Sequence, residues 1–178
     1  MAAVEEEPNV HIRALVWLAL LTGCRRSELC ERTWDDVDLE GRTLTVPRRK
    51  GGDPRVFALS APAVAILEAL PKMSGNDHLI PSPRLSDKPL SDHAIDAAWK
   101  RIRQRAGVKN LTLHDFRRSV SSMMQAEGAS LLTASRALGH ASIATTEKHY
   151  SILPDDATRD ALEAHGQRVL RIVNGGAQ

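Results

Sequence analysis

The spacing of apolar residues changes twice along the chain, and this change constrains the fold more than any other feature of the sequence. Over residues 9–22 the apolar side chains recur at helical spacing, and Gly23 follows as a helix stop. Between residues 37 and 59 they alternate with polar residues in three short runs joined by turns. From Ser60 onward the helical spacing returns. The chain is therefore predicted to be an α+β, mainly helical protein with a small three-stranded antiparallel sheet.

Cap residues and glycines divide the rest of the chain into helices. A short helix is expected to begin near Ser27, which is a good N-cap residue. Residues 71–89 are rich in Pro, Ser, Gly and Asp and are predicted to form a loop. Further helices are predicted over residues 60–70, 91–106, 112–128, 130–138, 142–150 and 155–173. The length of 178 residues fits a single domain over residues 1–178.

The composition excludes several classes of protein. Hydrophobic residues make up 42% and charged residues 26% of the chain, which is ordinary for a soluble globular protein. The apolar run over residues 14–21 is too short to cross a bilayer, so no membrane partner is expected. Cys24 and Cys30 are too few for a metal cluster or a disulfide scaffold, and no metal site is predicted. Residues 1–8 have no basic region of the kind that opens a signal peptide, so a cytoplasmic location is expected.

The net charge of +2 conceals an uneven distribution of charge. Residues 31–40 hold five acids and one base, whereas residues 97–118 hold seven bases and one acid. The turn over residues 48–55 adds four bases and one acid. Concentrated basic stretches of this kind indicate a site for a polyanion. The candidate DNA-binding residues are Arg48, Arg49, Arg55, Lys100, Arg103 and Arg118. A solvated helix face remains an equal alternative for Lys100, Arg101 and Arg105.

Five cationic or imidazole side chains lie in turns or at expected helix ends, where phosphate groups commonly bind. Arg25 follows a helix stop, and His114 and Arg117 are three residues apart in the first turn of a predicted helix. Lys50 lies at the tip of the basic turn, and His140 lies between two short helices. These features predict a phosphate-binding domain that faces nucleic acid, and by themselves they supply no reaction.

Four segments of the chain resemble the motifs of one enzyme family, in the family's order. Residues 22–29 (TGCRRSEL) resemble the first arginine box of the tyrosine recombinases, the phage integrase family. Residues 114–119 (HDFRRS) are similar to the His-x-x-Arg box of that family, and Lys50 is similar to its β-hairpin lysine. Leu138-Gly139-His140, followed by Tyr150, resembles the box that carries the last basic residue and the nucleophile.

The resemblance implies a reaction on double-stranded DNA. Tyr150 would attack a phosphodiester, forming a 3′-phosphotyrosine link and freeing a 5′-hydroxyl group. Arg25 and Arg117 would clamp the scissile phosphate and stabilise its transition state. Ligation would reverse these steps with another 5′-hydroxyl group. Because the bond energy stays in the phosphotyrosine, the resemblance implies no cofactor and no metal.

The resemblance also assigns the remaining residues of the site. His114 would act as general base toward the tyrosine hydroxyl, and Lys50 as general acid toward the departing 5′-oxygen. His140 would hydrogen-bond a non-bridging oxygen of the phosphate. Glu28, from the first box, would support Arg25. The expected partners are DNA and further copies of the chain, as a tetramer on DNA and as a monomer when free. A nucleoid-associated protein of bacterial or phage origin is expected.

The sequence departs from the family pattern in two respects. The family usually places its tyrosine nine residues after the last box histidine, whereas here position nine is His149 and position ten is Tyr150. Tyr150 is the one tyrosine of the chain and is therefore chosen as nucleophile. The family's N-terminal DNA-gripping domain is expected to be absent from this chain. For the helix over residues 155–173, docking on a neighbouring protomer and folding back on its own domain both remain open.

Two other functions remain as alternatives. One is a DNA-binding module without catalysis, because residues 130–150 have the helix, glycine-containing turn and helix of a helix-turn-helix. The other is a nicking and resealing enzyme similar to the type IB topoisomerases, which would use the same side chains.

Overall fold

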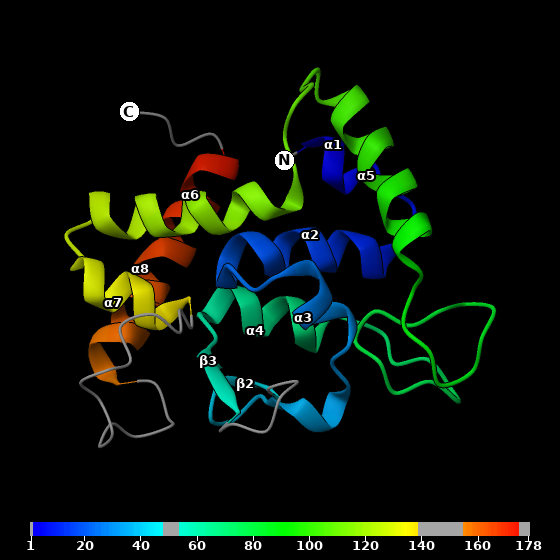
Figure 1. Cartoon of the computed structure of the whole chain (residues 1–178), viewed down its shortest axis with the longest axis horizontal. Helices are drawn as coiled ribbons and strands as arrows, with labels where there is room; N and C mark the ends of the chain where they lie inside the picture. The colour runs from blue at the N-terminus through cyan, green and yellow to red at the C-terminus, as the bar shows by residue number, and fades with distance from the viewer. Residues whose placement is uncertain (1, 48–53, 139–154, 175–178) are drawn as a thin grey trace.

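The computed structural model describes residues 2–47, 54–138 and 155–174. A central helix, α2 (Val10–Thr22), runs through the middle of the molecule (Figure 1). The side chain of Asn9 caps α2 by accepting from the backbone N–H groups of His11 and Ile12, at 2.9 and 3.2 Å. The helix ends at Gly23, whose φ of +65° is easy for glycine alone. The predicted helix over residues 9–22 is therefore confirmed.

Three helices surround α2 and bury it. They are α4 (Ala61–Glu68), α6 (Leu113–Ala126) and α8 (Asp156–Val173), and each contacts α2. Leu15, Leu18 and Leu21 of α2 are at most 1% exposed between them. The main apolar core thus forms around α2, and it fixes Gly23 beside α6.

The first helix of the chain packs against a helix from the middle of the sequence. They are α1 (Ala2–Glu5) and α5 (Asp92–Arg105), which contact each other. The carboxylate of Glu7, 1% exposed, accepts from Arg101 at 2.9 Å and lies 3.5 Å from Nη2 of Arg105. Two arginines of the basic stretch on α5 therefore form ion pairs with Glu7 of the same chain.

A three-stranded antiparallel sheet lies below the helices, as predicted (Figure 1). Its strands are β1 (Val37–Asp38), β2 (Thr43–Val46) and β3 (Arg55–Ala58), in the order β1-β2-β3. A short 3-10 helix, η1 (Trp34–Asp36), leads into β1. Leu44 pairs with Phe57, and both side chains are buried in the core. Val46 pairs with Arg55, which is the first residue of β3.

The short helix predicted to begin near Ser27 is present and begins at Arg26, but its N-cap residue was predicted wrongly. The helix α3 (Arg26–Cys30) has Arg25 as its N-cap residue, so that Ser27 lies inside the helix. The physical reason is the carboxylate of Glu28, which accepts from the backbone N–H of Arg25 at 2.8 Å and so stabilises an earlier start.

The last described helices form a second, smaller apolar cluster with α6. The helix α7 (Leu131–Ala137) is capped by Ser130 and packs with α6 and α8 around Val120, Met124 and Leu162. The predicted helix over residues 142–150 lies outside the described residues.

The helix α8 packs on its own domain. It contacts α2, α4, α6 and α7, and Leu162 and Val169 are buried in these contacts. His165 is fully buried, and its Nε2 lies 2.9 Å from the carbonyl oxygen of Leu20. Among the described helices, none combines the length and the apolar character needed to cross a bilayer.

Candidate active site

Arg25 stands at the start of α3, directly after the buried Cys24. Its Nη1 donates to Oε1 of Glu28 at 2.9 Å, and its backbone N–H donates to Oε2 at 2.8 Å. The Arg25 side chain is 45% exposed, whereas that of Glu28 is 9% exposed. A buried carboxylate therefore holds an arginine whose outer part still reaches solvent.

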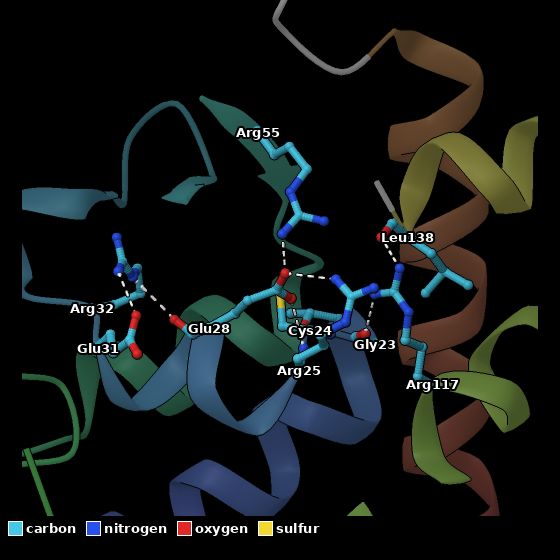
Figure 2. A network of polar contacts seen from close by, with 10 residues as sticks. Gly23, Cys24, Arg25, Glu28, Glu31, Arg32, Arg55, Arg117 and Leu138 are labelled. Carbon is cyan, nitrogen blue, oxygen red and sulfur yellow. Dashed lines mark hydrogen bonds and ion pairs between the residues drawn. The ribbon is translucent and has the colours of Figure 1, made fainter. Parts of the chain in front are cut away.

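Arg117 approaches the same place from α6 and is almost completely buried. Its side chain crosses to the end of α2, where Nη1 donates to the carbonyl oxygen of Gly23 at 2.8 Å. Its Nη2 also donates to the carbonyl oxygen of Leu138, at the end of α7. Arg117 is thus fixed by two backbone carbonyl groups that lie 115 positions apart in sequence, and both contacts are visible in Figure 2.

The amino end of α6 presents His114 next to these arginines. The side chain of Thr112 caps the helix, and Asp115 accepts from the backbone N–H and hydroxyl of Thr112 at 2.8 and 2.6 Å. These hydrogen bonds, aided by Arg118, lower the pKa of Asp115. Phe116 packs edge-on against Trp99 of α5, with ring centroids 5.5 Å apart, and so anchors the first turn. The side chain of His114, in this first turn of α6, is exposed.

A pocket of about 460 Å³ gathers these side chains. The residues that line it are Arg25, His114, Arg117, Arg118, Ser121, Ser122 and Leu138. Ser121 and Ser122 were not predicted from the sequence. Their position on α6, four residues after Arg117 and Arg118, was the signal that could have placed them on the same face.

Arg55 enters the site from β3. Figure 2 shows its guanidinium group against the carboxylate of Glu28, so that Glu28 lies between Arg55 and Arg25. The Arg55 side chain is 18% exposed and also lies over the ring of Phe57, 5.6 Å from the centroid. Arg32, on the other side of α3, donates to the backbone carbonyl of Glu28 at 3.0 Å.

Positive charge is concentrated around the carboxylate of Glu28. Burial, together with the charges of Arg25 and Arg55, lowers the pKa of Arg117 to about 10, so that it stays protonated at neutral pH. Burial and the charge of Arg25 also lower the pKa of Arg55. Burial raises the pKa of the Cys24 thiol to about 11, which leaves it protonated beside the arginines. Such a site favours an anionic ligand.

A second pocket, of about 490 Å³, shares Arg25 and His114 with the first. Arg103 of α5 lines it, and its Nη1 donates to the carbonyl oxygen of Lys109 at 2.8 Å. Lys100 is exposed on the same helix, and Arg118 is exposed and lies 3.6 Å from Asp115.

The structure does not describe every residue that the sequence predicts for the site. Arg25, His114 and Arg117 are brought to one pocket, and Glu28 contacts Arg25. Five further predicted residues lie outside the described part of the chain: Arg48, Arg49, Lys50, His140 and Tyr150. In the part of the chain that is described, no group of three or more His, Cys, Asp or Glu side chains is arranged to hold a metal ion.

Known sequences assign the chain to a family. A model described as "Phage integrase family" matches residues 1–155, and the chain belongs to that family. Tyrosine recombinase XerC of Xanthomonas campestris pv. campestris (strain B100) is 34% identical over 139 residues, which are 76% of this chain and 42% of XerC. Tyrosine recombinase XerA of Pyrococcus furiosus is 30% identical over 142 residues, which are 78% of this chain and 49% of XerA. The chain thus spans less than half the length of these curated relatives.

Solved structures share the fold. The integrase from mycobacterium phage Brujita matches 91% of this chain and 54% of its own, with a TM-score of 0.74 and 23% identity. The lambda integrase catalytic core matches 77% of this chain and 84% of its own, with a TM-score of 0.60 and 26% identity. The fold is therefore that of a tyrosine recombinase catalytic domain, as the sequence predicted.

Proposed function

We propose that the chain is the catalytic domain of a site-specific DNA recombinase, which cuts and rejoins double-stranded DNA through a 3′-phosphotyrosine intermediate. The observation that carries this proposal is the pocket that joins Arg25, His114 and Arg117, since these side chains come from two boxes about 90 residues apart. Membership of the phage integrase family supports the same reaction.

In the proposed reaction, the two arginines bind the scissile phosphate. Attack on a phosphodiester adds negative charge to the non-bridging oxygens, and guanidinium groups stabilise that charge by paired hydrogen bonds. Arg117 is held rigidly by Gly23 and Leu138, so little reorganisation is needed when the phosphate arrives. Arg25, held on one side by Glu28, offers its exposed part to the same ligand.

The other steps use four residues. Tyr150 attacks phosphorus and His114 accepts its proton, while Lys50 donates a proton to the departing 5′-oxygen. His140 hydrogen-bonds a non-bridging oxygen. Because the phosphotyrosine conserves the energy of the broken bond, religation needs neither a metal ion nor a nucleotide cofactor.

The proposed substrate is duplex DNA, and the proposed active assembly is a tetramer of this chain on DNA. Lambda integrase, 26% identical over 83% of this chain, has been solved as a tetramer bound to a Holliday junction. The exposed Lys100 and the pocket residue Arg103 are proposed to add DNA contacts beside the scissile phosphate. Because the reaction is on chromosomal or phage DNA, we propose that it takes place in the cytoplasm.

The experiment that tests this function begins without a known target site. The chain is incubated with a pool of duplexes that carry a nick near a randomised central segment, and covalent adducts are recovered under denaturing conditions. We expect the wild-type chain to enrich one family of sequences as protein–DNA adducts. Tyr150→Phe should give no adduct with the same pool while still binding the enriched duplex. Binding without any adduct from the wild type would instead favour the non-catalytic module.

A further inference from the structure

The carboxylate of Glu28 lies between two arginines that come from different parts of the fold. Its Oε1 accepts from Nη1 of Arg25 at 2.9 Å and also pairs with Nη2 of Arg55, as Figure 2 shows. The exposed fraction of the side chains falls from 45% for Arg25 to 18% for Arg55 and 9% for Glu28. The pair of Glu28 and Arg55 is therefore the buried part of this group, and Arg25 is its outer end.

The β-sheet and the Phe57 ring hold Arg55 in place, whereas Glu28 lies on a short helix. Arg55 begins β3, where it pairs with Val46 of β2, and its guanidinium group lies 5.6 Å from the centroid of the buried Phe57 ring. Glu28 belongs to a helix of five residues and has a long side chain that loses rotamer freedom when it is fixed. The sheet thus adds a second anchor to a carboxylate that α3 already holds through the backbone N–H of Arg25.

The charges point the same way. Arg55 lies close enough to Arg25 for that charge to lower its pKa, after the larger effect of burial. Two neighbouring guanidinium groups repel each other, and the carboxylate of Glu28, which contacts both, offsets part of this cost. Arg55 is therefore placed to act on Glu28, and its side chain is mostly covered by protein.

We propose that Arg55 is a positioning residue, which holds the carboxylate of Glu28 so that Glu28 aims Arg25 into the pocket. This inference rests on the proposed function, because the purpose of aiming Arg25 is to bind the scissile phosphate. It replaces the expectation that Arg55 binds DNA directly. It also gives the hairpin a second task, because the strand that follows Lys50 is tied to α3 through this contact.

The test compares Arg55→Gln and Arg55→Lys with the wild type on the nicked duplex recovered by adduct selection. At saturating DNA, Arg55→Gln should slow single-turnover cleavage on the order of 100-fold, because Arg25 loses its orientation. Arg55→Lys keeps one ion pair to Glu28 and should recover part of that loss. Arg84→Gln, which removes a charge from an exposed loop residue, serves as the matched control and should cleave at the wild-type rate.

The salt dependence of binding separates positioning from direct DNA contact. If Arg55 acts through Glu28, the slope of log affinity against log salt concentration should be the same in the wild type and in both variants. A direct phosphate contact would instead flatten that slope by about 0.9 in Arg55→Gln, and this result would overturn the proposal. A double variant with Glu28→Gln should cleave no more slowly than the slower single variant. If the rate losses of the two single variants multiplied in the double variant, that result would also overturn the proposal.

One readout does not depend on cleavage. In ¹⁵N NMR spectra of arginine side chains, the guanidinium group of Arg25 should rotate slowly in the wild type and faster in Arg55→Gln. Unchanged rotation would overturn the positioning role even if the wild type gave no adduct, which would separately refute the proposed function. Thermal unfolding is recorded for each variant, and if Arg55→Gln does not fold, Arg55→Lys carries the rotation, salt and rate measurements.

Discussion

The guanidinium group of Arg117 donates to the carbonyl oxygen of Gly23 at 2.8 Å, and so joins α6 to the end of α2. Its other hydrogen bond within the described residues goes to the carbonyl of Leu138. Both partners are neutral, so neither cancels the charge of this buried arginine. The charge remains for a ligand in the pocket, while the two carbonyl groups fix the direction of the guanidinium plane.

Arg117→Lys should separate charge from geometry. Lysine keeps the positive charge but cannot donate in two fixed directions to the carbonyl groups of Gly23 and Leu138. We expect single-turnover cleavage of the selected duplex to fall on the order of 100-fold, with a small change in DNA affinity. Arg84→Lys, at an exposed loop position outside the pocket, is the control and should change neither quantity. Cleavage by Arg117→Lys at close to the wild-type rate would contradict the assigned role.

Gly23→Ala should destabilise the junction on which Arg117 depends. The backbone of Gly23 has φ of +65°, and an added Cβ would overlap Cδ2 of Leu138. The left-handed conformation costs a non-glycine residue about 1–2 kcal/mol, and the overlap adds about 1–3 kcal/mol. Urea unfolding followed by circular dichroism measures the sum.

Gly107→Ala provides the matched control for that substitution. Gly107 has φ of +68°, yet among the described residues no atom beyond its chain neighbours lies within 4 Å of its added Cβ. The loss of unfolding free energy should therefore be about 1–2 kcal/mol here, from the backbone term alone. Equal losses at Gly23 and Gly107 would mean that the contact with Leu138 has no energetic consequence.

The secondary structure could be predicted where the signals are local. The caps at Asn9 and Thr112 act within three residues, so the sequence located the starts of α2 and α6. The N-cap of α3 was predicted at Ser27 and is Arg25, because the carboxylate of Glu28 at the third helical position outweighed a favourable N-cap type. The signal, Glu28 three residues after Arg25, was present in the sequence.

The site could be predicted only as far as its motifs extend. The grouping of Arg25, His114 and Arg117 follows from two boxes, and the pocket brings them together. The contact between Glu28 and Arg55 joins a helix to a strand 27 residues later, and no local spacing announces it. Such a pair depends on how β3 packs beside α3, which is decided by the whole apolar core rather than by either segment.

The basic stretch on α5 should divide into structural and DNA-binding residues. Arg105→Gln removes contacts to Glu7 and to the backbone of Ala3, and should lower the unfolding free energy by about 0.5–1 kcal/mol without altering the salt dependence of DNA binding. Lys100→Gln, one and a half turns away and exposed, should leave stability unchanged and flatten the salt slope by about 0.9. Binding assays and urea unfolding of the two variants check this. A stability loss in Lys100→Gln together with a changed salt slope in Arg105→Gln would refute it.

The buried His165 should make the stability of the domain depend on pH. Burial lowers the pKa of His165, against the opposing effects of its hydrogen bond to Leu20 and of Glu127, and Arg168 adds to the lowering. The unfolded chain therefore binds a proton near pH 6.5 that the folded chain does not bind, so the stability from neutral His165 is full above that pH. As pH falls from about 6.5 toward the lowered pKa, the unfolding free energy should decrease.

Urea unfolding of the wild type and of His165→Gln between neutral and mildly acidic pH measures this, and the variant should lose less stability on acidification. His93→Gln, at an exposed position on α5, should retain the wild-type slope. Parallel slopes for the wild type and His165→Gln would show that this imidazole does not govern the acid sensitivity of the α8 interface.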